Sequence, residues 1–323
     1  MLKFISIPSF LILCFFITSC GTEVEKIAID NSQKDVRPKI ALIMKSLANE
    51  FFVTMEEGAL AHQKANADKY DLITNGIKNE TDLAQQVRLI DQMISVGVDA
   101  IVIAPADSKA IVPALSRVKD AGIVIVNIDN RLDENILLQY GLSVPFVGPN
   151  NFKGAQVVGE YLATKLNKGA QVAIIEGVQT AYNSQRRVAG FKKAMDLGEM
   201  EVVAQQSADW DQTKAVNITS AILIQYPEIE AILCANDSMA LGAVAAVKQA
   251  GLSERIKIVG FDNISAAKEL IALGDLTATA DQHGDLLAVY GIEYAIELLD
   301  SEGGLPDKST TVDLITKETQ GMQ

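Results

Sequence analysis

The stretch AIVIAPADSKAIVPALSRVKDAGIVIVNI, residues 100–128, decides the fold of this chain. Both of its ends are short apolar runs rich in β-branched residues, which favour strands. Between them, Ile111, Leu115 and Val118 recur at the three- and four-residue spacing of a helix. Strands that are apolar on both faces are typical of a parallel sheet with helices on both sides. The stretch therefore predicts a strand–helix–strand unit of a doubly wound α/β fold.

The same alternation of strands and helices extends from this unit in both directions. On the N-terminal side, we expect strands at residues 40–44 and 72–74 and helices at 51–69 and 81–95. On the C-terminal side, we expect strands at 172–175, 202–204, 231–233 and 256–259 and helices at 153–167, 185–196, 213–226 and 239–250. After residue 263, the pattern predicts a strand at 276–279, a helix at 286–299 and a last strand at 311–315. Prolines and glycines cluster near residues 141–151 and separate two α/β halves.

The composition is that of an ordinary globular protein with enough residues for two domains. The chain has 323 residues, of which 49% are hydrophobic and 21% are charged. Its 28 basic and 41 acidic residues give a net charge of −13, so we expect no nucleic-acid partner, because phosphates require a basic surface. The sequence has no Walker, Gly-x-Gly-x-x-Gly, Gly-x-Ser-x-Gly or His-Glu-x-x-His motif and no His/Cys cluster. We therefore expect no enzymatic activity, no cofactor and no metal.

The N-terminus has the pattern of a secretory signal. Lys3 precedes an apolar run over residues 4–17, which is shorter than a membrane-spanning helix, and Thr18-Ser19-Cys20 follows it. The pattern resembles a bacterial lipobox, which predicts a signal peptide over residues 1–19 and lipidation of Cys20. A plain signal peptide with a chance cysteine is the alternative. The polar segment 20–37 would be a tether, so we expect the folded part in the periplasm or cell envelope, anchored to a membrane.

The residues that follow the predicted strands share a chemistry suited to a polyol. In a doubly wound sheet, these carboxyl ends meet at one edge, where ligands bind. The residues there are mainly Asp, Asn, Gln and Arg, with several aromatic rings. Amides, carboxylates and guanidinium groups bond pairs of hydroxyl groups, and aromatic faces pack against the C–H groups of a sugar ring.

Six segments along the chain resemble motifs of the type I periplasmic sugar-binding proteins, the family that includes the ribose-binding proteins. Residues 49–52, Asn-Glu-Phe-Phe, match an Asn-Pro-Phe-Phe segment of the family. The most specific match is Asn-Asp-Ser-Met-Ala-Leu-Gly-Ala at residues 236–243. The other matches are residues 97–105, 187–191, 259–262 and 279–282. The resemblance runs from about residue 39 to residue 317.

The resemblance implies two doubly wound parallel-sheet lobes joined by three hinge crossovers. The N-terminal lobe would comprise residues 38–148 and 283–312, and the C-terminal lobe residues 149–282 and 313–323. The implied function is that of a monomeric solute-binding lipoprotein, which captures a pentose, hexose or polyol between the lobes and delivers it to an ABC permease. A sugar sensor that presents its closed form to a membrane receptor kinase is the alternative.

The resemblance also implies which residues contact the sugar. The first lobe would supply Asn49, Phe51, Phe52, Asp129 and the neighbouring Asn130. The second lobe and the hinge would supply Arg187, Trp210, Asn236, Asp262 and Gln282. Of these, Phe52 and Trp210 would stack on the two faces of the ring, while Phe261 lines or backs the site. Four further residues are open as ligand contacts: Arg131, Gln185, Arg186 and His283.

Structural roles compete with binding at several of these positions. Asn236 or Asp237 could cap the helix that follows, and Asp262 could bind the amides of a turn. Phe51 could equally be a core residue. Arg186 is better interpreted as a solvated charge on a helix.

Four departures from the family concern specificity, and one is that the second-lobe arginine of ribose-binding proteins aligns nearer Gln185 than Arg187. Ala104 stands where ribose-binding proteins have an asparagine, and Asn130 stands where they have an arginine. The stretch 131–149 is also several residues longer. The sequence therefore predicts a sugar site without choosing the sugar.

Overall fold

A computed structural model describes residues 37–301 and 303–320. The expected signal peptide over residues 1–19, the lipidation site Cys20 and the tether up to residue 36 lie outside these residues and stay predictions. Within the described residues, no helix is both long enough and apolar enough to cross a membrane.

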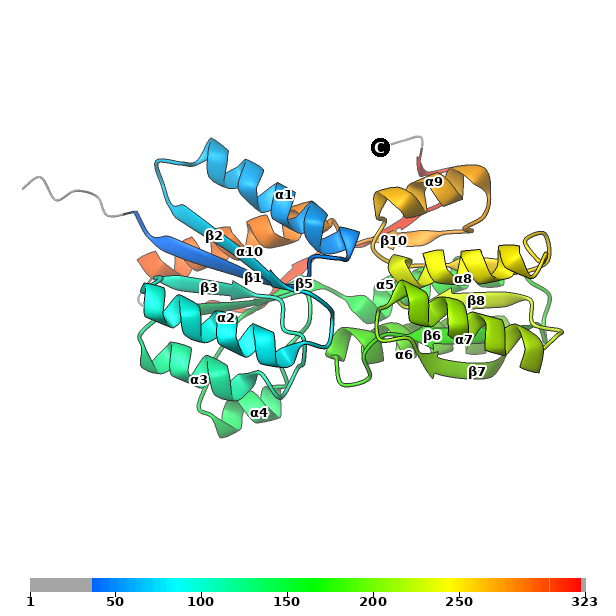
Figure 1. Cartoon of the computed structure of the whole chain (residues 1–323), viewed down its shortest axis with the longest axis horizontal. Coiled ribbons are helices and arrows are strands. Elements are labelled where there is room, and N and C mark those ends of the chain that lie inside the picture. Colours follow the sequence, from blue (N-terminus) through cyan, green and yellow to red (C-terminus); the bar gives the residue numbers. More distant parts are fainter. Residues whose placement is uncertain (1–36, 302, 321–323) are drawn as a thin grey trace, which may run out of the picture. The chain divides into compact units, whose positions relative to one another are not determined.

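The first lobe is built on a parallel sheet of six strands (Figure 1). In spatial order the strands are β11 (Lys308–Thr310), β5 (Phe146–Pro149), β4 (Val124–Ile128), β3 (Ala100–Ile103), β1 (Lys39–Ser46) and β2 (Asp71–Ile77). The central strands β1, β3 and β4 pair in register, with Leu42 opposite Val102 and Val102 opposite Val126. Their apolar residues are buried on both faces of the sheet, as the sequence predicts.

Helices cover both faces of this sheet. The helices α1 (Glu50–Ala65) and α10 (Gly284–Asp300) pack together on one face. The helices α2 (Leu83–Val96) and α3 (Val112–Asp120) cover the other, and the short helix α4 (Glu134–Gln139) follows β4. The apolar residues of each strand divide between the two faces, because side chains alternate along a strand.

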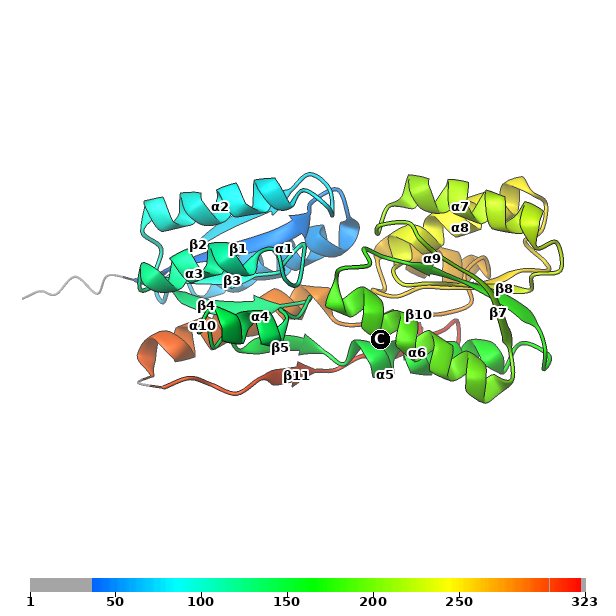
Figure 2. The ribbon, with the colours of Figure 1, turned by 90° about the horizontal axis from the view of Figure 1, so that it is seen from below.

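The second lobe is built on a parallel sheet of four strands, covered in the same way (Figure 2). In spatial order the strands are β7 (Glu201–Ser207), β6 (Gln171–Glu176), β8 (Ala231–Cys234) and β9 (Lys257–Val259). Its helices are α5 (Asn151–Ala163), α6 (Tyr182–Gly198), α7 (Gln212–Gln225), α8 (Asp237–Gln249) and α9 (Ser265–Leu273). The pairs α5–α6 and α7–α8 pack side by side. A small antiparallel pair, β10 (Thr279–Asp281) with β12 (Asp313–Ile315), completes this lobe.

The chain passes between the lobes three times. The crossings lie between β5 and α5, between β10 and α10, and between β11 and β12. The fold class expected from the sequence, two doubly wound parallel-sheet lobes with three crossovers, is therefore confirmed.

Several expected elements differ from the structure near these crossings. The last strand expected at 311–315 is β12, which begins only at Asp313, and the strand β11, which precedes it at Lys308–Thr310 in the first sheet, was not predicted. The strand expected at 276–279 begins only at Thr279. The sequence analysis did not predict α4 or α9, which are short helices of six and nine residues with little periodicity to detect.

Helices α5 and α6 approach each other closely at Gly190. A Cβ atom on Gly190 would lie 2.3 Å from the carbonyl oxygen of Phe152 and 2.9 Å from the backbone nitrogen of Gln156. Gly190 lies one turn after Arg187 on α6, so this approach also sets the position of the Arg187 side chain.

We predict that Gly190→Ala destabilises the protein by about 1–3 kcal/mol, because the extra methyl group forces α5 and α6 apart. Urea unfolding followed by circular dichroism measures the change. Gly303→Ala is the matched control, since a Cβ atom there meets nothing within 4 Å. Equal destabilisation by both substitutions would contradict the close helix approach.

Asp237 joins three elements at the carboxyl end of the second sheet. Its carboxylate accepts hydrogen bonds from Thr279 Oγ1 at 2.7 Å and from the backbone N–H of Ile264 at 3.1 Å. These residues begin β10 and precede α9. Burial raises the pKa of Asp237 to about 6, although these hydrogen bonds act in the opposite direction.

We predict that the titration of Asp237 makes the free energy of unfolding depend on pH. Between about pH 4 and pH 6, the folded protein holds a proton that the unfolded chain has released, so the free energy of unfolding falls as the pH rises, by about 1.4 kcal/mol per pH unit. The stabilisation that comes from this proton is fully present below pH 4 and is lost above pH 6. Urea unfolding across this range should give a flatter pH dependence for Asp237→Asn than for the wild type, and parallel curves would contradict the assignment.

Candidate functional site

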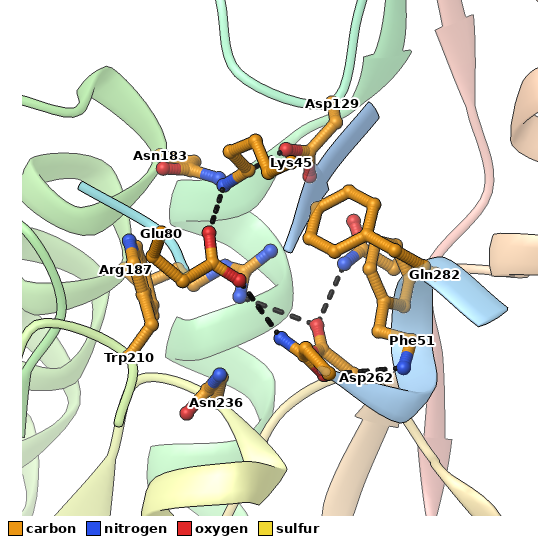
Figure 3. Close-up of a pocket in the computed structure, with 12 residues that line it drawn as sticks. Lys45, Phe51, Glu80, Asp129, Asn183, Arg187, Trp210, Asn236, Asp262 and Gln282 are labelled. Atoms are coloured by element: carbon orange, nitrogen blue, oxygen red, sulfur yellow. Dashed lines mark hydrogen bonds and ion pairs between the residues drawn. The ribbon is translucent and has the colours of Figure 1, made fainter. Parts of the chain in front are cut away.

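A cavity lies where the carboxyl ends of the two sheets face each other (Figure 3). The space between its lining side chains is about 210 Å³, part of which is open to solvent. Its lining consists of Lys45, Asn49, Phe51, Phe52, Glu80, Asp129, Asn183, Arg187, Trp210, Asn236, Asp262 and Gln282. Both lobes and one of the crossovers contribute to it, so closure of the lobes is what forms the cavity.

The backbone of three lining residues has a conformation that is unusual for residues other than glycine. Asp129, Trp210 and Asp262 have φ values of 59°, 67° and 119°. Each follows a strand, β4, β7 or β9, and turns its side chain toward the cavity. Such conformations cost on the order of 1–3 kcal/mol each and concentrate at functional sites. Their presence around a single cavity supports a binding role for it.

Trp210 is held against the backbone of the neighbouring strand end. A Cβ atom on Gly177, which follows β6, would lie 2.1 Å from the indole ring, so only glycine leaves room for this ring. Trp210 is 4% exposed and is the only tryptophan of the chain. Its fluorescence is therefore a natural reporter of what enters the cavity.

A buried cation lies between two carboxylates on the first-lobe side. Lys45 Nζ is 3.2 Å from Asp129 Oδ2 and 3.4 Å from Glu80 Oε2, and all three residues are at least 93% buried. Burial alone would lower the pKa of Lys45, but the charges of Asp129 and Glu80 outweigh it and raise the pKa. Burial raises the pKa of Glu80, although Lys45 and a hydrogen bond from Asn49 Nδ2 counteract the rise.

The ammonium group of Lys45 also faces two aromatic rings. Its Nζ lies 5.2 Å from the ring centre of Phe52 and 5.5 Å from that of Trp210. Contacts of this length are favourable cation–π interactions. Phe51 completes the aromatic wall by meeting the ring of Phe52 edge to face, with ring centres 5.1 Å apart.

Arg187 organises the second-lobe side. Its guanidinium donates hydrogen bonds to Asn151 Oδ1 at 2.7 Å, to the carbonyl oxygen of Ala235 at 2.9 Å and to Asp262 Oδ1 at 3.3 Å. It also stacks on the ring of Phe261 at 3.8 Å from the ring centre, so Phe261 backs the cavity without lining it. Burial raises the pKa of Asp262 well above its usual range, although the charge of Arg187 counteracts the rise.

Three buried oxygens around the cavity receive no hydrogen bond from any described residue. They are Glu80 Oε2, Asp129 Oδ2 and Gln282 Oε1. The two carboxylate oxygens lie near Lys45 Nζ, but neither of these contacts has hydrogen-bond geometry. The ion pairs with Lys45 partly compensate the two carboxylate oxygens, whereas Gln282 Oε1 has no such partner, and a buried acceptor without a donor costs about 1–3 kcal/mol. Hydroxyl or N–H donors of a ligand would complete the bonding of all three oxygens.

The structure brings together nine of the ten residues expected to bind the ligand. The exception is Asn130, which does not line the cavity. Its side chain donates to the carbonyl oxygen of Pro105 at 2.9 Å and accepts from the backbone N–H of Asn183 at 3.2 Å. The amide nitrogen of Asn130 therefore bonds within the first lobe, and its oxygen joins the two lobes.

The four residues left open also lie outside the lining. Arg131 bonds to Glu134 and Asp307, and Arg186 stacks on Phe152. Gln185 donates to the carbonyl oxygen of Gln179, and His283 pairs with Asp313 at 2.8 Å.

At two positions where the sequence left a structural and a binding role as alternatives, the residue has a structural role and also lines the cavity. Asn236 caps α8 by accepting from the backbone N–H of Met239 at 2.9 Å, and it also lines the cavity. Phe51 is 3% exposed and belongs to the first-lobe core, yet one edge of its ring reaches the cavity.

The sequence analysis missed Lys45, Glu80 and Asn183. Lys45 is a charged residue directly after the apolar run 40–44 of β1, which was a usable signal. Glu80 was missed because β2 was expected to end at residue 74, whereas it runs to Ile77 and so brings Glu80 close to the end of the strand. Asn183 escaped because α6 was expected to start at residue 185, whereas it starts at Tyr182.

Comparison with known proteins agrees with this geometry. The sequence model of a protein family, described as periplasmic binding protein domain, matches residues 40–303 of this chain. The D-ribose/D-allose-binding protein of Pseudomonas aeruginosa is 50% identical over 310 residues, which cover 95% of this chain and 97% of that protein. The ribose import binding protein of Bacillus subtilis is 32% identical over 286 residues, covering 88% of this chain and 90% of that protein.

Two solved structures of ABC transporter solute-binding proteins are also similar. One, from Burkholderia multivorans, is 53% identical with a TM-score of 0.85, covering 87% of this chain and 99% of that one. The other, from Actinobacillus succinogenes with bound D-allose, is 35% identical with a TM-score of 0.84, covering 89% of this chain and 100% of that one. The resemblance found in the sequence is therefore confirmed, and the chain belongs to the type I periplasmic sugar-binding proteins of ABC transporters.

Proposed function

We propose that this protein captures an aldose, D-allose or D-ribose, in the cavity between its lobes and delivers it to an ABC importer. The observation that carries this proposal is the set of three buried oxygens without donors, Glu80 Oε2, Asp129 Oδ2 and Gln282 Oε1. Sugar hydroxyls are donors as well as acceptors, so one monosaccharide can satisfy these oxygens while it accepts from Lys45 and Arg187.

The walls of the cavity suit the remaining surface of a sugar. The rings of Phe51, Phe52 and Trp210 offer apolar faces to the C–H groups of a pyranose or furanose ring. The narrow space between the lining side chains favours a single sugar unit over an oligosaccharide. Ligand binding would favour closure of the lobes, because the lining residues come from both of them.

The similar proteins support the choice of sugar. The Pseudomonas aeruginosa relative is named for D-ribose and D-allose, and the Actinobacillus succinogenes structure contains D-allose. The two sugars share their configuration at C2, C3 and C4. We propose that these three hydroxyls are what the carboxylates and amides of this cavity recognise.

The proposed setting follows from the family and from the N-terminal sequence. Proteins of this family act in the periplasm. We propose that Cys20 carries a lipid anchor, that the monomer is the active form and that the protein has no enzymatic activity. Mass spectrometry of the protein purified from membranes tests the anchor, since an acylated Cys20 shifts the mass of the N-terminal peptide.

We predict that D-allose and D-ribose quench or shift Trp210 fluorescence and that D-glucose and D-xylose do not. D-Glucose differs from D-allose at C3 alone, and D-xylose differs from D-ribose at C3 alone. A site built to bond one hydroxyl rejects its absence strongly, so we expect the epimers to bind roughly 100-fold or more weakly. The protein is unfolded and refolded first to remove carried-over ligand. Equal binding of the C3 epimers would contradict the proposed recognition.

We predict that Asp129→Asn weakens sugar binding by about 2–5 kcal/mol, since it removes a buried charge that pairs with Lys45 and a free acceptor for the ligand. Isothermal titration calorimetry with D-allose gives the affinity. Asp68→Asn is the control, because Asp68 is exposed on the first lobe and far from the cavity lining. Unchanged affinity in Asp129→Asn would place the sugar elsewhere.

A further inference from the structure

Two helices of the second lobe begin without a cap from their own sequence. The residues at their N-cap positions are Ala181 for α6 and Ile264 for α9, and neither has a side chain that accepts a hydrogen bond. Six other helices begin with an Asn or Asp whose side chain accepts an N–H of the first turn. The free N–H groups at the start of a helix need acceptors. In α6 the N–H of Ser184 finds one within the helix, in Asn183 Oδ1 at 2.9 Å, but the first N–H groups of α6 and α9 depend on groups outside their own segments.

These acceptors come from the first lobe. The backbone N–H of Tyr182, at the start of α6, donates to Ser108 Oγ at 2.9 Å, and the next N–H donates to Asn130 Oδ1 at 3.2 Å. The backbone N–H of Ser265, at the start of α9, donates to Glu50 Oε1 at 2.7 Å. These bonds join residues 74, 53 and 215 positions apart in the chain.

Glu50 lies at the N-termini of two helices at once. It is the first residue of α1, in the first lobe, and its carboxylate accepts from the start of α9, in the second lobe. Both helix N-termini carry partial positive charge, which favours a carboxylate between them. A proline, which the related Asn-Pro-Phe-Phe segment has at this place, has no side-chain acceptor, so the bond to α9 depends on the glutamate of this chain.

None of these acceptors lines the cavity. Their bonds therefore require the lobes to meet, but they do not require the sugar. We infer that Glu50, together with Ser108 and Asn130, latches the closed form by capping second-lobe helices from the first lobe. The latch rests on the proposed function, and it sets how long any sugar is held without selecting which sugar is held.

The test removes one acceptor without disturbing the helix that carries it. Proline is well tolerated at the first position of a helix, and Asn49 has the extended backbone (ψ 120°) that a following proline requires. Glu50→Pro therefore keeps α1 and loses the bond to α9. Glu57→Gln is the control, because it removes the same charge from an exposed position of α1. Ser108→Ala removes the acceptor for α6 and provides a second, independent variant.

Stopped-flow measurement of Trp210 fluorescence gives the sugar dissociation rates. We expect Glu50→Pro and Ser108→Ala to accelerate the dissociation of D-allose and of D-ribose by the same factor, roughly three- to tenfold, with Glu57→Gln unchanged. A change confined to one of the two sugars would make these residues specificity determinants and would overturn the latch. Unchanged rates for both sugars in both variants would overturn it as well.

Small-angle X-ray scattering without sugar separates failure of the latch from failure of the proposed function. If no sugar binds the wild type, the proposed function has failed, and the latch is judged on the sugar-free protein alone. Glu50→Pro and Ser108→Ala should then give a larger radius of gyration than the wild type and Glu57→Gln. Equal radii in all four proteins would overturn the latch.

Discussion

The buried guanidinium of Arg187 is the interaction on which the second half of the cavity depends. It bonds to the start of α5, to the carbonyl that ends β8 and to the carboxylate that follows β9, and it stacks on Phe261. A charge that is 2% exposed can remain only if such partners surround it. The positions of three segments that are distant in the chain are therefore tied to one side chain, and Asp262 and Gln282 are aligned with it through the hydrogen bond from Gln282 Nε2 to Asp262 Oδ1.

Lys45 is the corresponding buried cation in the first half of the cavity, but its single positive charge does not balance the charges of its two partners. One ammonium group faces two carboxylates, Glu80 and Asp129, and both keep an oxygen without a donor. In the proposed function, the hydroxyl groups of the ligand would supply the missing donors. The unusual backbone conformations of Asp129, Trp210 and Asp262 direct these side chains into the same site. Their conformational strain costs free energy, which the packing of the sheets beneath them offsets.

Expectations from the sequence were accurate where a pattern is local. The strands β1, β3, β4, β6 and β8 were predicted because their residues are apolar on both faces, and nine lining residues were predicted from the ends of strands and their match to family motifs. The errors arise where position depends on boundaries. Glu80 and Asn183 were missed because β2 and α6 each extend three residues beyond the ranges expected for them. Asn130, which was also expected at the ligand, lies outside the lining, and its side-chain oxygen accepts from Asn183 of the other lobe.

The sequence by itself determined the fold class, the family and the chemistry at the strand ends, because hydrophobic periodicity and short motifs are properties of neighbouring residues. Only the tertiary structure decided which polar groups are left without partners and which helices are capped by side chains of the other lobe. Both depend on distances between segments up to 215 residues apart, as in the bond from Ser265 to Glu50. Whether a buried oxygen is satisfied is a property of the closed cavity as a whole, and no local pattern along the chain encodes it.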